Sequence, residues 1–405
     1  MLARLVPIEG TETIDASSRE LLGRVLAEEI VAPMSLPPFR ASAMDGYACR
    51  AADITATPTS PGQPDDILLT VVGNSLAGHP SEDTLAPGTC VAIMTGARVP
   101  DDADSVIPCE LTERVDGRVR FDGTCPRGQY VREVGSDTRK GQPLLVAGST
   151  VGPAAAALLI AHGCGPVKVK RRLSVALFST GDELVAAGST LIRGQIHDAN
   201  RPLLEGMLGG AAIDIIDLGI CPDTPDTLRQ LLTRAEGADL LISTGGVSVG
   251  DADHVRAVLG ESGSIDWWRI AMKPGRPLAF GFTGADQPWL GLPGNPVSVA
   301  VTTLMFVHPA IDRLLGRETA WPLPLMLPTR DRLEKDAGRV EFQRGTLVVD
   351  EQGAGVSTTG AQDSHMLSSL VRADCLVELD RESTGAAIGE PVKVHPLRAY
   401  GTAPF

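Results

Sequence analysis

Between residues 173 and 316 the chain alternates short apolar runs with amphipathic stretches. Apolar runs of this length are typical of buried strands, and apolar positions spaced by three or four residues are typical of helices. The predicted strands are residues 173–178, 212–218, 239–242, 265–270, 278–282 and 289–292, and the predicted helices are about 200–208, 225–235, 253–259 and 297–315. Because such alternation produces right-handed crossovers, we predict a doubly wound α/β domain with a parallel sheet.

Two other regions are richer in β-like runs. Residues 47–133 contain short runs separated by Gly, Pro and Asp, which predicts a small β module. Residues 321–328 contain three prolines, which excludes a regular helix and indicates a linker, and the runs after it predict a β domain without helices. Residues 11–29 carry apolar positions near one face and predict a helix.

These elements predict a multidomain α/β plus β protein. We expect an α/β domain of residues 1–21 and 173–320, and an elongated connecting domain of residues 22–41 and 139–172. We expect a β module of residues 42–138 to be inserted into the connecting domain, and a small C-terminal β domain to occupy residues 321–405. An acidic stretch within the β module, Asp101, Asp102 and Asp104, is expected to be a solvated loop tip.

Composition narrows the class of protein. The 405 residues are 43% hydrophobic and 21% charged, which is ample for folded cores. The net charge of −14 argues against nucleic acid as a main partner, because binding to phosphate backbones needs a basic surface. The seven cysteines lack CxxC spacing and are expected to be reduced, mostly buried thiols. The chain has no signal-like N-terminus and no membrane-length apolar run, so we expect a cytoplasmic protein.

Three predicted strands end in turns suited to an anion. One reads Ser243-Thr244-Gly245-Gly246-Val247-Ser248-Val249-Gly250, a second Ser179-Thr180-Gly181-Asp182, and a third Leu292-Pro293-Gly294-Asn295-Pro296. Adjacent glycines let a ligand approach the backbone N–H groups closely. Asn295 and Pro296 fit the cap and first position of a helix. Together the turns predict a phosphate-binding crevice at the carboxyl ends of the strands.

Carboxylates follow the same strands. They are Asp182, Glu183, Asp198, Asp223 and Asp253. Carboxylates beside a phosphate would repel it unless a hard cation lay between them, and Mg²⁺ with one or two carboxylates plus ligand oxygens meets that need. Capping of helices by Asp198 and Asp223 is the alternative. Three histidines stand near these loops without zinc-ligand spacing: His197, His254 and His365.

Local positive charge is concentrated in Lys273-Pro274-Gly275-Arg276, with Arg269 nearby, and in Arg339 and Arg344. Two cations across a rigid turn could hold an oxyanion such as phosphate, sulfate or molybdate. A basic hairpin tip is the alternative.

With these residues the sequence resembles the molybdopterin molybdenumtransferase family, the bacterial MoeA type that also occurs as a plant E domain and as the gephyrin E domain. The resemblance covers nearly the whole chain. It departs from the usual pattern at His197 and Ala199, at Ser136, and at Asp363 and His365. The motifs that carry it are Ser42-Ala43-Met44-Asp45-Gly46-Tyr47-Ala48, Met94-Thr95-Gly96-Ala97, Ser179-Thr180-Gly181-Asp182-Glu183-Leu184, Gly245-Gly246-Val247-Ser248-Val249-Gly250, Lys273-Pro274-Gly275 and Leu292-Pro293-Gly294-Asn295-Pro296.

The resemblance implies an L-shaped homodimer with four domains per subunit and an N-terminal helix packed on the α/β domain. It implies a transferase that takes adenylylated molybdopterin and molybdate, splits off AMP with Mg²⁺ present, and leaves molybdenum on the dithiolene. The implied metal ligands are Asp182, Glu183, Asp223 and Asp253.

The resemblance also implies which residues bind the substrates and which take part in the reaction. Lys273, Arg276, Arg344 and Ser364 receive the molybdate oxyanion and the pterin phosphate, while Asp45 and Thr95 reach the cleft from the partner subunit. Asp45, Thr95, Glu183, Lys273 and Arg276 are the catalytic set. The cofactor-binding set is Thr180, Gly181, Gly245, Gly246, Ser248, Pro293, Gly294, Asn295, Arg344 and Ser364.

Two competing functions remain. A related transferase adenylylates molybdopterin, but it needs only the α/β domain, whereas this chain adds the N-terminal and C-terminal regions. A scaffold that anchors partner proteins, as the gephyrin domain does, is a second hypothesis. An adenylyltransferase and the apo-proteins of molybdoenzymes are expected as partners.

Overall fold

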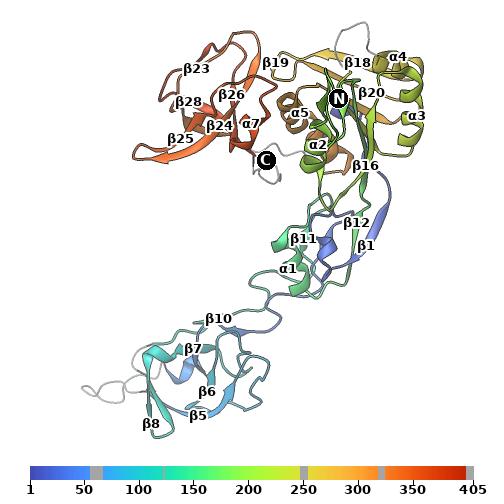
Figure 1. Cartoon of the computed structure of the whole chain (residues 1–405). Helices are drawn as coiled ribbons and strands as arrows, with labels where there is room; N and C mark the ends of the chain where they lie inside the picture. The colour runs from blue at the N-terminus through green and yellow to red at the C-terminus, as the bar shows by residue number, and fades with distance from the viewer. Residues whose placement is uncertain (55–66, 122–123, 247–253, 318–323, 398–405) are drawn as a thin grey trace. The chain divides into compact units, whose positions relative to one another are not determined.

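The computed structural model describes residues 1–54, 67–121, 124–246, 254–317 and 324–397, and these form two compact units (Figure 1). Unit 1 contains Met1–Glu28, Gly148–Gly152 and Val167–Phe405, and unit 2 contains Glu29–Ala147 and Pro153–Pro166. The finer division into four domains stays a prediction.

The centre of unit 1 is a six-stranded sheet. Its order is β16 (Ile213–Cys221), β13 (Leu173–Thr180), β17 (Leu240–Thr244), β21 (Pro288–Leu292), β20 (Pro277–Phe282) and β18 (Ser264–Arg269). All six predicted strands are present, and the first four are parallel. The expected parallel order fails for β20, which is antiparallel to both neighbours. Only five residues join β20 to β21, whereas a parallel crossover needs a dozen or more.

Helices cover both faces of this sheet, as the sequence pattern predicts (Figure 1). In β13, Val175 and Leu177 pack into one core cluster with Leu204 of α2, whereas Ala176 and Phe178 pack into another that includes residues of α3 and α4. Strand side chains alternate between faces, so one strand supplies both cores. The helices are α2 (Asn200–Leu208), α3 (Pro225–Ala235), α4 (His254–Ser262), α5 (Pro296–Thr302), a π-helical turn η5 (Thr303–Val307) and α6 (His308–Leu314).

The helix at Pro296–Leu314 is apolar and long enough to cross a membrane by length and composition. In this fold 78% of its 18-residue apolar window is buried, and its Val299, Val307 and Ile311 belong to the core beside the sheet. It is therefore a core helix, in agreement with the predicted helix at 297–315.

The predicted helix at 11–29 is wrong. The segment forms strand β1 (Thr11–Asp15), which pairs with β12 (Pro166–Lys170), and a short 3-10 turn η2 (Arg19–Leu21). Gly10 and Gly23 adopt φ values of 93° and 80°, which a helix does not allow, and β-branched residues in β1 favour extended backbone. The expected N-terminal helix is only the turn η1 (Leu2–Arg4), although Leu5 and Ile8 after it join the core.

The C-terminal part of unit 1 is a second sheet. Its order is β19 (Met272–Lys273), β24 (Val340–Asp350), β26 (Cys375–Leu379), β28 (Pro391–Pro396) and β22 (Leu325–Pro328), with β25 (Gly353–Thr358) paired to β24 and a separate pair β23 (Leu333–Glu334) and β27 (Gly385–Ala386). The predicted linker at residues 321–328 is wrong in its described part, because residues 325–328 form β22. This strand lies at the edge of the sheet, a position that tolerates proline. The expectation of no helices is also wrong: α7 (Leu367–Val371) places Leu370 in a core with Val301 and Leu304.

Unit 2 contains the predicted β module. Its sheet has the order β7 (Ser105–Pro108), β4 (Gly46–Cys49), β6 (Thr89–Ile93), β5 (Ile67–Ser75), β9 (Arg118–Phe121) and β8 (Thr112–Val115). Cys49, Cys90 and Cys125 lie in its core, in line with the expected buried thiols. The rest of unit 2 comprises β2 (Ile30–Val31) with β11 (Pro143–Leu145), β3 (Ala41–Ser42) with β10 (Val131–Arg132), and α1 (Pro153–Ala161).

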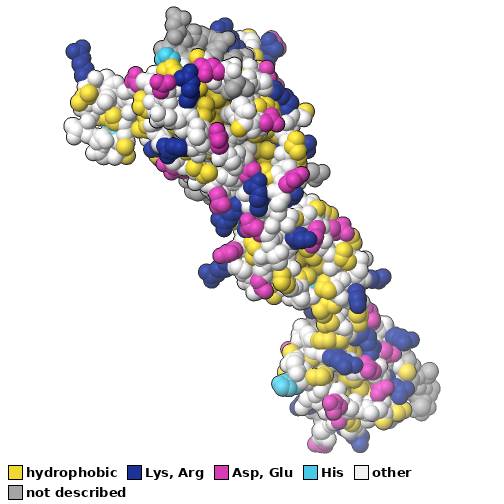
Figure 2. All heavy atoms as spheres, turned by 90° about the vertical axis from the view of Figure 1, so that its right-hand side faces the viewer, with side chains coloured by type: hydrophobic (Ala, Val, Ile, Leu, Met, Phe, Trp, Pro, Cys, Tyr) yellow, Lys and Arg dark blue, Asp and Glu magenta, His cyan; other side chains and the backbone are white. Residues whose placement is uncertain are grey.

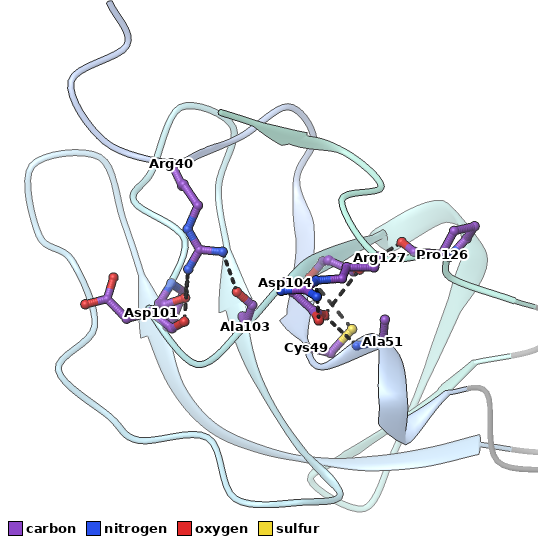
Figure 3. Close-up of polar contacts among 10 residues, drawn as sticks. Arg40, Cys49, Ala51, Asp101, Ala103, Asp104, Pro126 and Arg127 are labelled. Carbon is purple, nitrogen blue, oxygen red and sulfur yellow. Dashed lines mark hydrogen bonds and ion pairs between the residues drawn. The ribbon is translucent and has the colours of Figure 1, made fainter. Parts of the chain in front are cut away.

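The acidic loop of this module is only partly a solvated tip (Figure 3). Asp101 and Asp102 are exposed, but the Asp104 carboxylate accepts a hydrogen bond from the Ala51 N–H at 2.6 Å and lies 3.5 Å from the Arg127 Nε. Arg40 donates to backbone carbonyls of the same loop, including that of Ala103 at 2.8 Å. Asp104 is therefore structural, because its carboxylate orders the turn after β4.

Candidate functional site

Three turns from the parallel strands meet at one end of the sheet in unit 1. The register places Ser179 beside Thr244 and Thr244 beside Leu292, so the three strands end level with one another. Beyond them lies a cavity of about 630 Å³, called here the large cavity. The predicted convergence of the turns is confirmed, and the turn residues that line the cavity are Thr180, Gly181, Thr244, Gly245, Gly246, Gly294, Asn295 and Pro296.

Hydrogen bonds from Asn200 and Thr244 hold two of these turns together. The Asn200 Nδ2 donates to the Thr244 Oγ1 at 3.0 Å and to the Gly294 carbonyl at 2.6 Å. The Thr244 hydroxyl donates in turn to the Pro293 carbonyl at 3.0 Å. The sequence does not mark either residue for this role, although Asn200 begins a predicted helix in a polar stretch that follows Asp198.

Gly245 and Gly246 are required by the geometry of the middle turn. Their φ values are 87° and 63°, in the left-handed region that other residues rarely adopt. A Cβ on Gly245 would lie 2.4 Å from the Thr180 carbonyl oxygen, and one on Gly246 would lie 2.7 Å from Val255 Cγ2. Only glycine lets the turn lie this close to the first turn. Ser248, the other predicted ligand in this loop, lies outside the described residues.

The acidic side of the large cavity is built from linked loops. Glu183 and Asp223 line it, and Asp223 accepts a hydrogen bond from the Thr180 hydroxyl. The Asp223 N–H donates to the Asp182 carboxylate at 3.0 Å, so both loops share one network. Thr224 caps α3, which rules out the alternative that the Asp223 side chain is that cap. Asp198, in contrast, caps α2 through the N–H groups of Asn200 and Arg201.

The donor set of these loops suits a hard cation. Glu183 and Asp223 offer carboxylate oxygens to the large cavity, and Mg²⁺ is commonly held by one or two carboxylates together with substrate oxygens. The described residues contain no group of three or more His, Cys, Asp or Glu side chains that could hold a metal ion without help from a ligand. Asp253, the fourth predicted ligand, is outside the described residues.

Lys273 lines a second cavity, whereas Glu183 and Asp223 line the large one. A small cavity of about 340 Å³ is lined by Lys273, Glu341, Gln362 and Asp363 among others. The Lys273 Nζ lies 3.3 Å from the Glu341 Oε2. Lys273 lies on β19, which belongs to the second sheet and pairs with β24. This pairing explains why Lys273 does not line the large cavity.

Residues 363–365 connect the two cavities. Asp363 lines the small cavity and His365 lines the large one. Between them, Ser364 accepts a hydrogen bond on its Oγ from the Asn295 Nδ2 at 2.8 Å, and its carbonyl accepts one from the Val297 N–H at 3.2 Å. Asn295 is thus the residue before α5, as predicted, but its side chain bonds to Ser364 instead of capping the helix.

The remaining predicted cations differ in accessibility. Arg344 is fully buried, and its guanidinium donates to the Ser369 Oγ at 3.0 Å and to the Asp363 carbonyl at 3.1 Å. Burial lowers the pKa of Arg344 to about 10. In this geometry Arg344 positions the 361–363 segment, and its predicted role as a ligand stays a prediction. Arg276 is exposed, and the next residue, Pro277, lines the large cavity.

Asp45 and Thr95, the predicted pair in unit 2, are in direct contact. The Asp45 Oδ1 accepts from the Thr95 hydroxyl at 2.6 Å and from its N–H at 2.7 Å. These bonds, the hydroxyl first, lower the pKa of Asp45 below its ordinary value. A cavity of about 390 Å³ is lined by Asp45 together with Tyr47, Arg114 and other residues.

Surface charge does not single out another site on the face drawn in Figure 2. The described Lys and Arg side chains there are interspersed with Asp and Glu, as suits a chain of net charge −14.

Comparisons with known proteins cover nearly the whole chain. Residues 1–163 match the MoeA N-terminal region (domain I and II), residues 176–313 match a probable molybdopterin binding domain, and residues 326–397 match the MoeA C-terminal region (domain IV). The chain is 38% identical to molybdopterin molybdenumtransferase of Haemophilus influenzae, over 96% of this chain and 94% of that protein. It is 35% identical to the protein of the same name from Nostoc sp., over 98% and 91%.

Solved structures of MoeA proteins are similar to this chain over nearly its whole length. A crystal structure of molybdopterin biosynthesis moeA protein from Pyrococcus horikoshii OT3 is similar with a TM-score of 0.82 and 28% identity, and covers 98% of this chain and 97% of that chain. A second such Pyrococcus structure has a TM-score of 0.76 and 30% identity, with 98% and 96% covered.

Proposed function

The chain belongs to the molybdopterin molybdenumtransferase family, and from that premise we propose that its two cavities hold adenylylated molybdopterin and molybdate, so that molybdenum passes to the dithiolene as AMP leaves. Molybdenum insertion in cofactor biosynthesis is the activity of this family. The identity of the two substrates, the metal and the assignment of residues are the proposal.

One observation carries it: a glycine-rich anion site and a lysine-containing cavity are joined by residues 363–365. Two anions that must react have to be held close together against their mutual repulsion. The turns at Gly181, Gly245 and Gly294 suit the phosphates, and Lys273 suits an oxyanion such as molybdate.

The acidic loops complete the site. Mg²⁺ at Glu183 and Asp223, helped by Asp182 and Asp253, would neutralise charge at the adenylate phosphate as AMP departs. Thr180 keeps the Asp223 carboxylate in place through its hydroxyl. Asn200 and Thr244 keep the Pro293–Asn295 turn against the middle turn, which fixes where the phosphates bind.

Ser364 and Arg276 are assigned to the contact between the two substrates. Ser364 is held by Asn295, which lines the large cavity, and Arg276 is exposed beside the lining residue Pro277. Arg344 supports this region from within, because it binds the Asp363 carbonyl.

Asp45 and Thr95 are assigned to the site of a second subunit in a homodimer. The two hydrogen bonds from Thr95 keep Asp45 ionised, which suits a charged catalytic group. A cytoplasmic location, an adenylyltransferase that delivers the substrate and apo-proteins that receive the product fit the same assignment.

The adenylyltransferase alternative is not favoured. The curated relatives that match nearly end to end are named molybdenumtransferases, and the N-terminal and C-terminal regions match MoeA families. No observation favours the scaffold hypothesis.

The test is release of AMP by the purified full-length protein from adenylylated molybdopterin. We expect release with molybdate and Mg²⁺, and little release when either is omitted or when EDTA is added. Release that is independent of molybdate, or consumption of ATP with free molybdopterin, would contradict the proposal and favour adenylylation.

A further inference from the structure

The large cavity contains an unusual set of side chains beside its turns and carboxylates. Among its described lining residues there is no Lys or Arg, and no Phe, Tyr or Trp. The planar rings that it offers are instead three imidazoles, those of His197, His254 and His365. A substrate with flat ring systems therefore meets imidazoles and aliphatic side chains in this part of the chain.

Two of the imidazoles belong to elements other than the glycine turns. His197 ends β15 (Ile196–His197), which pairs with β14 (Leu184–Val185), and His365 precedes α7 in the C-terminal part of unit 1. His254 begins α4 beside Val255, whose side chain adjoins the Gly246 turn. His254 therefore lies beside the Gly246 turn, whereas His197 and His365 enter the lining from β15 and from the segment before α7.

Both of these histidines have aliphatic neighbours in the lining. Leu184 and Ile196 line the cavity beside His197, and Leu367 lines it beside His365. Ile196 is 54% exposed and Leu184 is partly buried, so apolar surface is available to a ligand. Burial of such surface against a ring is favourable, whereas a phosphate would gain nothing from it.

The His197 imidazole and the backbone at His365 are held by their surroundings. The Nε2 of His197 lies 2.9 Å from the Ser189 carbonyl, which fixes the ring on the loop between β14 and β15. His365 is held through its chain, because its neighbour Ser364 is bonded to Asn295 and to the Val297 N–H. A ring that is held in place before binding, as that of His197 is, loses little freedom when a ligand stacks on it.

We propose that His197 and His365, with Leu184, Ile196 and Leu367, form a slot within the large cavity for a flat heteroaromatic ring of the substrate. The inference rests on the proposed function, whose substrate has two such rings, a pterin and an adenine. Both rings have the same chemistry toward the slot, and the histidines determine specificity without taking part in the reaction.

Steady-state kinetics of single variants tests the slot. His197→Ala and His365→Ala are expected to raise the KM for adenylylated molybdopterin about tenfold, with kcat little changed, because base stacking on a ring is worth roughly that much. His197→Phe and His365→Phe keep a ring without its nitrogens and are expected to restore most of the affinity. His79→Ala, at an exposed position in unit 2, is the control and is expected to behave like the unsubstituted protein.

Titration calorimetry separates the two rings. AMP alone and molybdopterin alone serve as probes for each variant. Weaker AMP binding by the alanine variants assigns the slot to adenine, and weaker molybdopterin binding with unchanged AMP binding assigns it to the pterin. Either result supports the slot, and unchanged binding of both probes overturns it.

Two further outcomes would overturn the inference. If the phenylalanine variants bind as weakly as the alanine variants, the imidazole nitrogens and not the rings make the contact. If the alanine variants melt at a lower temperature and the phenylalanine variants restore stability but not affinity, the residues are structural. Absence of molybdate-dependent AMP release in the unsubstituted protein would instead contradict the proposed function. The calorimetry would still test whether the slot binds AMP or molybdopterin.

Discussion

Substitution of Gly245 by alanine should damage the site through two separable effects. The first is backbone strain, since Gly245 has a φ of 87°. The second is a collision, since the added Cβ would lie 2.4 Å from the Thr180 carbonyl oxygen. Thr180 also holds Asp223, so relief of the collision moves the loop that carries the acidic group.

Gly237 provides a matched control for the first effect. Its φ is 88°, and a Cβ there meets nothing within 4 Å. Gly237→Ala should therefore show the strain alone, about 1–2 kcal/mol of lost stability. Gly245→Ala should show the same strain plus roughly 1–3 kcal/mol from overpacking. The difference between the two variants isolates the collision.

Urea unfolding and AMP release measure the two consequences. We expect Gly237→Ala to lose stability but keep its rate of AMP release, and Gly245→Ala to lose more stability and at least about tenfold in kcat/KM, the equivalent of a 1.4 kcal/mol defect at the transition state. Equal stability of the two variants together with unchanged kinetics of Gly245→Ala would refute the argument that the turns must lie this close.

Three other substitutions test other parts of the molecule. Asn200→Ala removes two hydrogen bonds, of 3.0 and 2.6 Å, and should cost about 1–3 kcal/mol of stability and lower kcat/KM; a variant with unchanged kinetics would show that the turns hold without it. Arg344→Met should lower the unfolding midpoint in urea because it leaves carbonyl groups without a donor, and a fully stable variant with weaker molybdate binding would instead make Arg344 a direct ligand. Hydrogen bonding to His395, then to Lys393, lowers the folded pKa of Glu378 below 4.5, so its stabilisation is present above about pH 4.5 and is lost as pH falls through the folded pKa. Glu378→Gln should therefore flatten the acid limb of a stability–pH curve, and an unchanged limb would contradict this.

The turns of the large cavity could be predicted because local rules and sheet geometry agree there. Thr180, Thr244 and Leu292 end apolar runs, and the ends of parallel strands lie together at one edge. The strands and helices between residues 173 and 316 were predictable for the same reason. The antiparallel pairing of β20 could not be predicted in this way. It results from the short connection between β20 and β21, and the apolar pattern does not indicate the direction of a strand.

The positions of Lys273 and Arg344 could not be predicted from the sequence. Lys273 enters the small cavity because β19 pairs with β24, about seventy positions further along the chain. Arg344 lies on β24, and its side chain is covered by α7 and the 361–363 segment. The sequence around Arg344 does not indicate either contact. Both depend on pairings between distant segments, whereas charge patterns along the chain indicate only that cations are present.

The prediction of a helix at residues 11–29 was wrong for a local reason. Apolar spacing in residues 11–29 resembled a helix, but Gly10 and Gly23 require left-handed backbone and β1 has a partner strand in β12. Strand pairing and glycine conformation together outweighed the periodicity.

The most direct test of the central claim is the molybdate concentration that gives half the maximal rate of AMP release, measured for the unsubstituted protein, for Lys273→Gln and for the exposed control Arg381→Gln. If Lys273 holds the oxyanion beside the adenylate, Lys273→Gln should raise this concentration about tenfold or more while its binding of adenylylated molybdopterin is unchanged, and Arg381→Gln should have no effect. An unchanged half-saturating concentration in Lys273→Gln would contradict the assignment of the small cavity to molybdate.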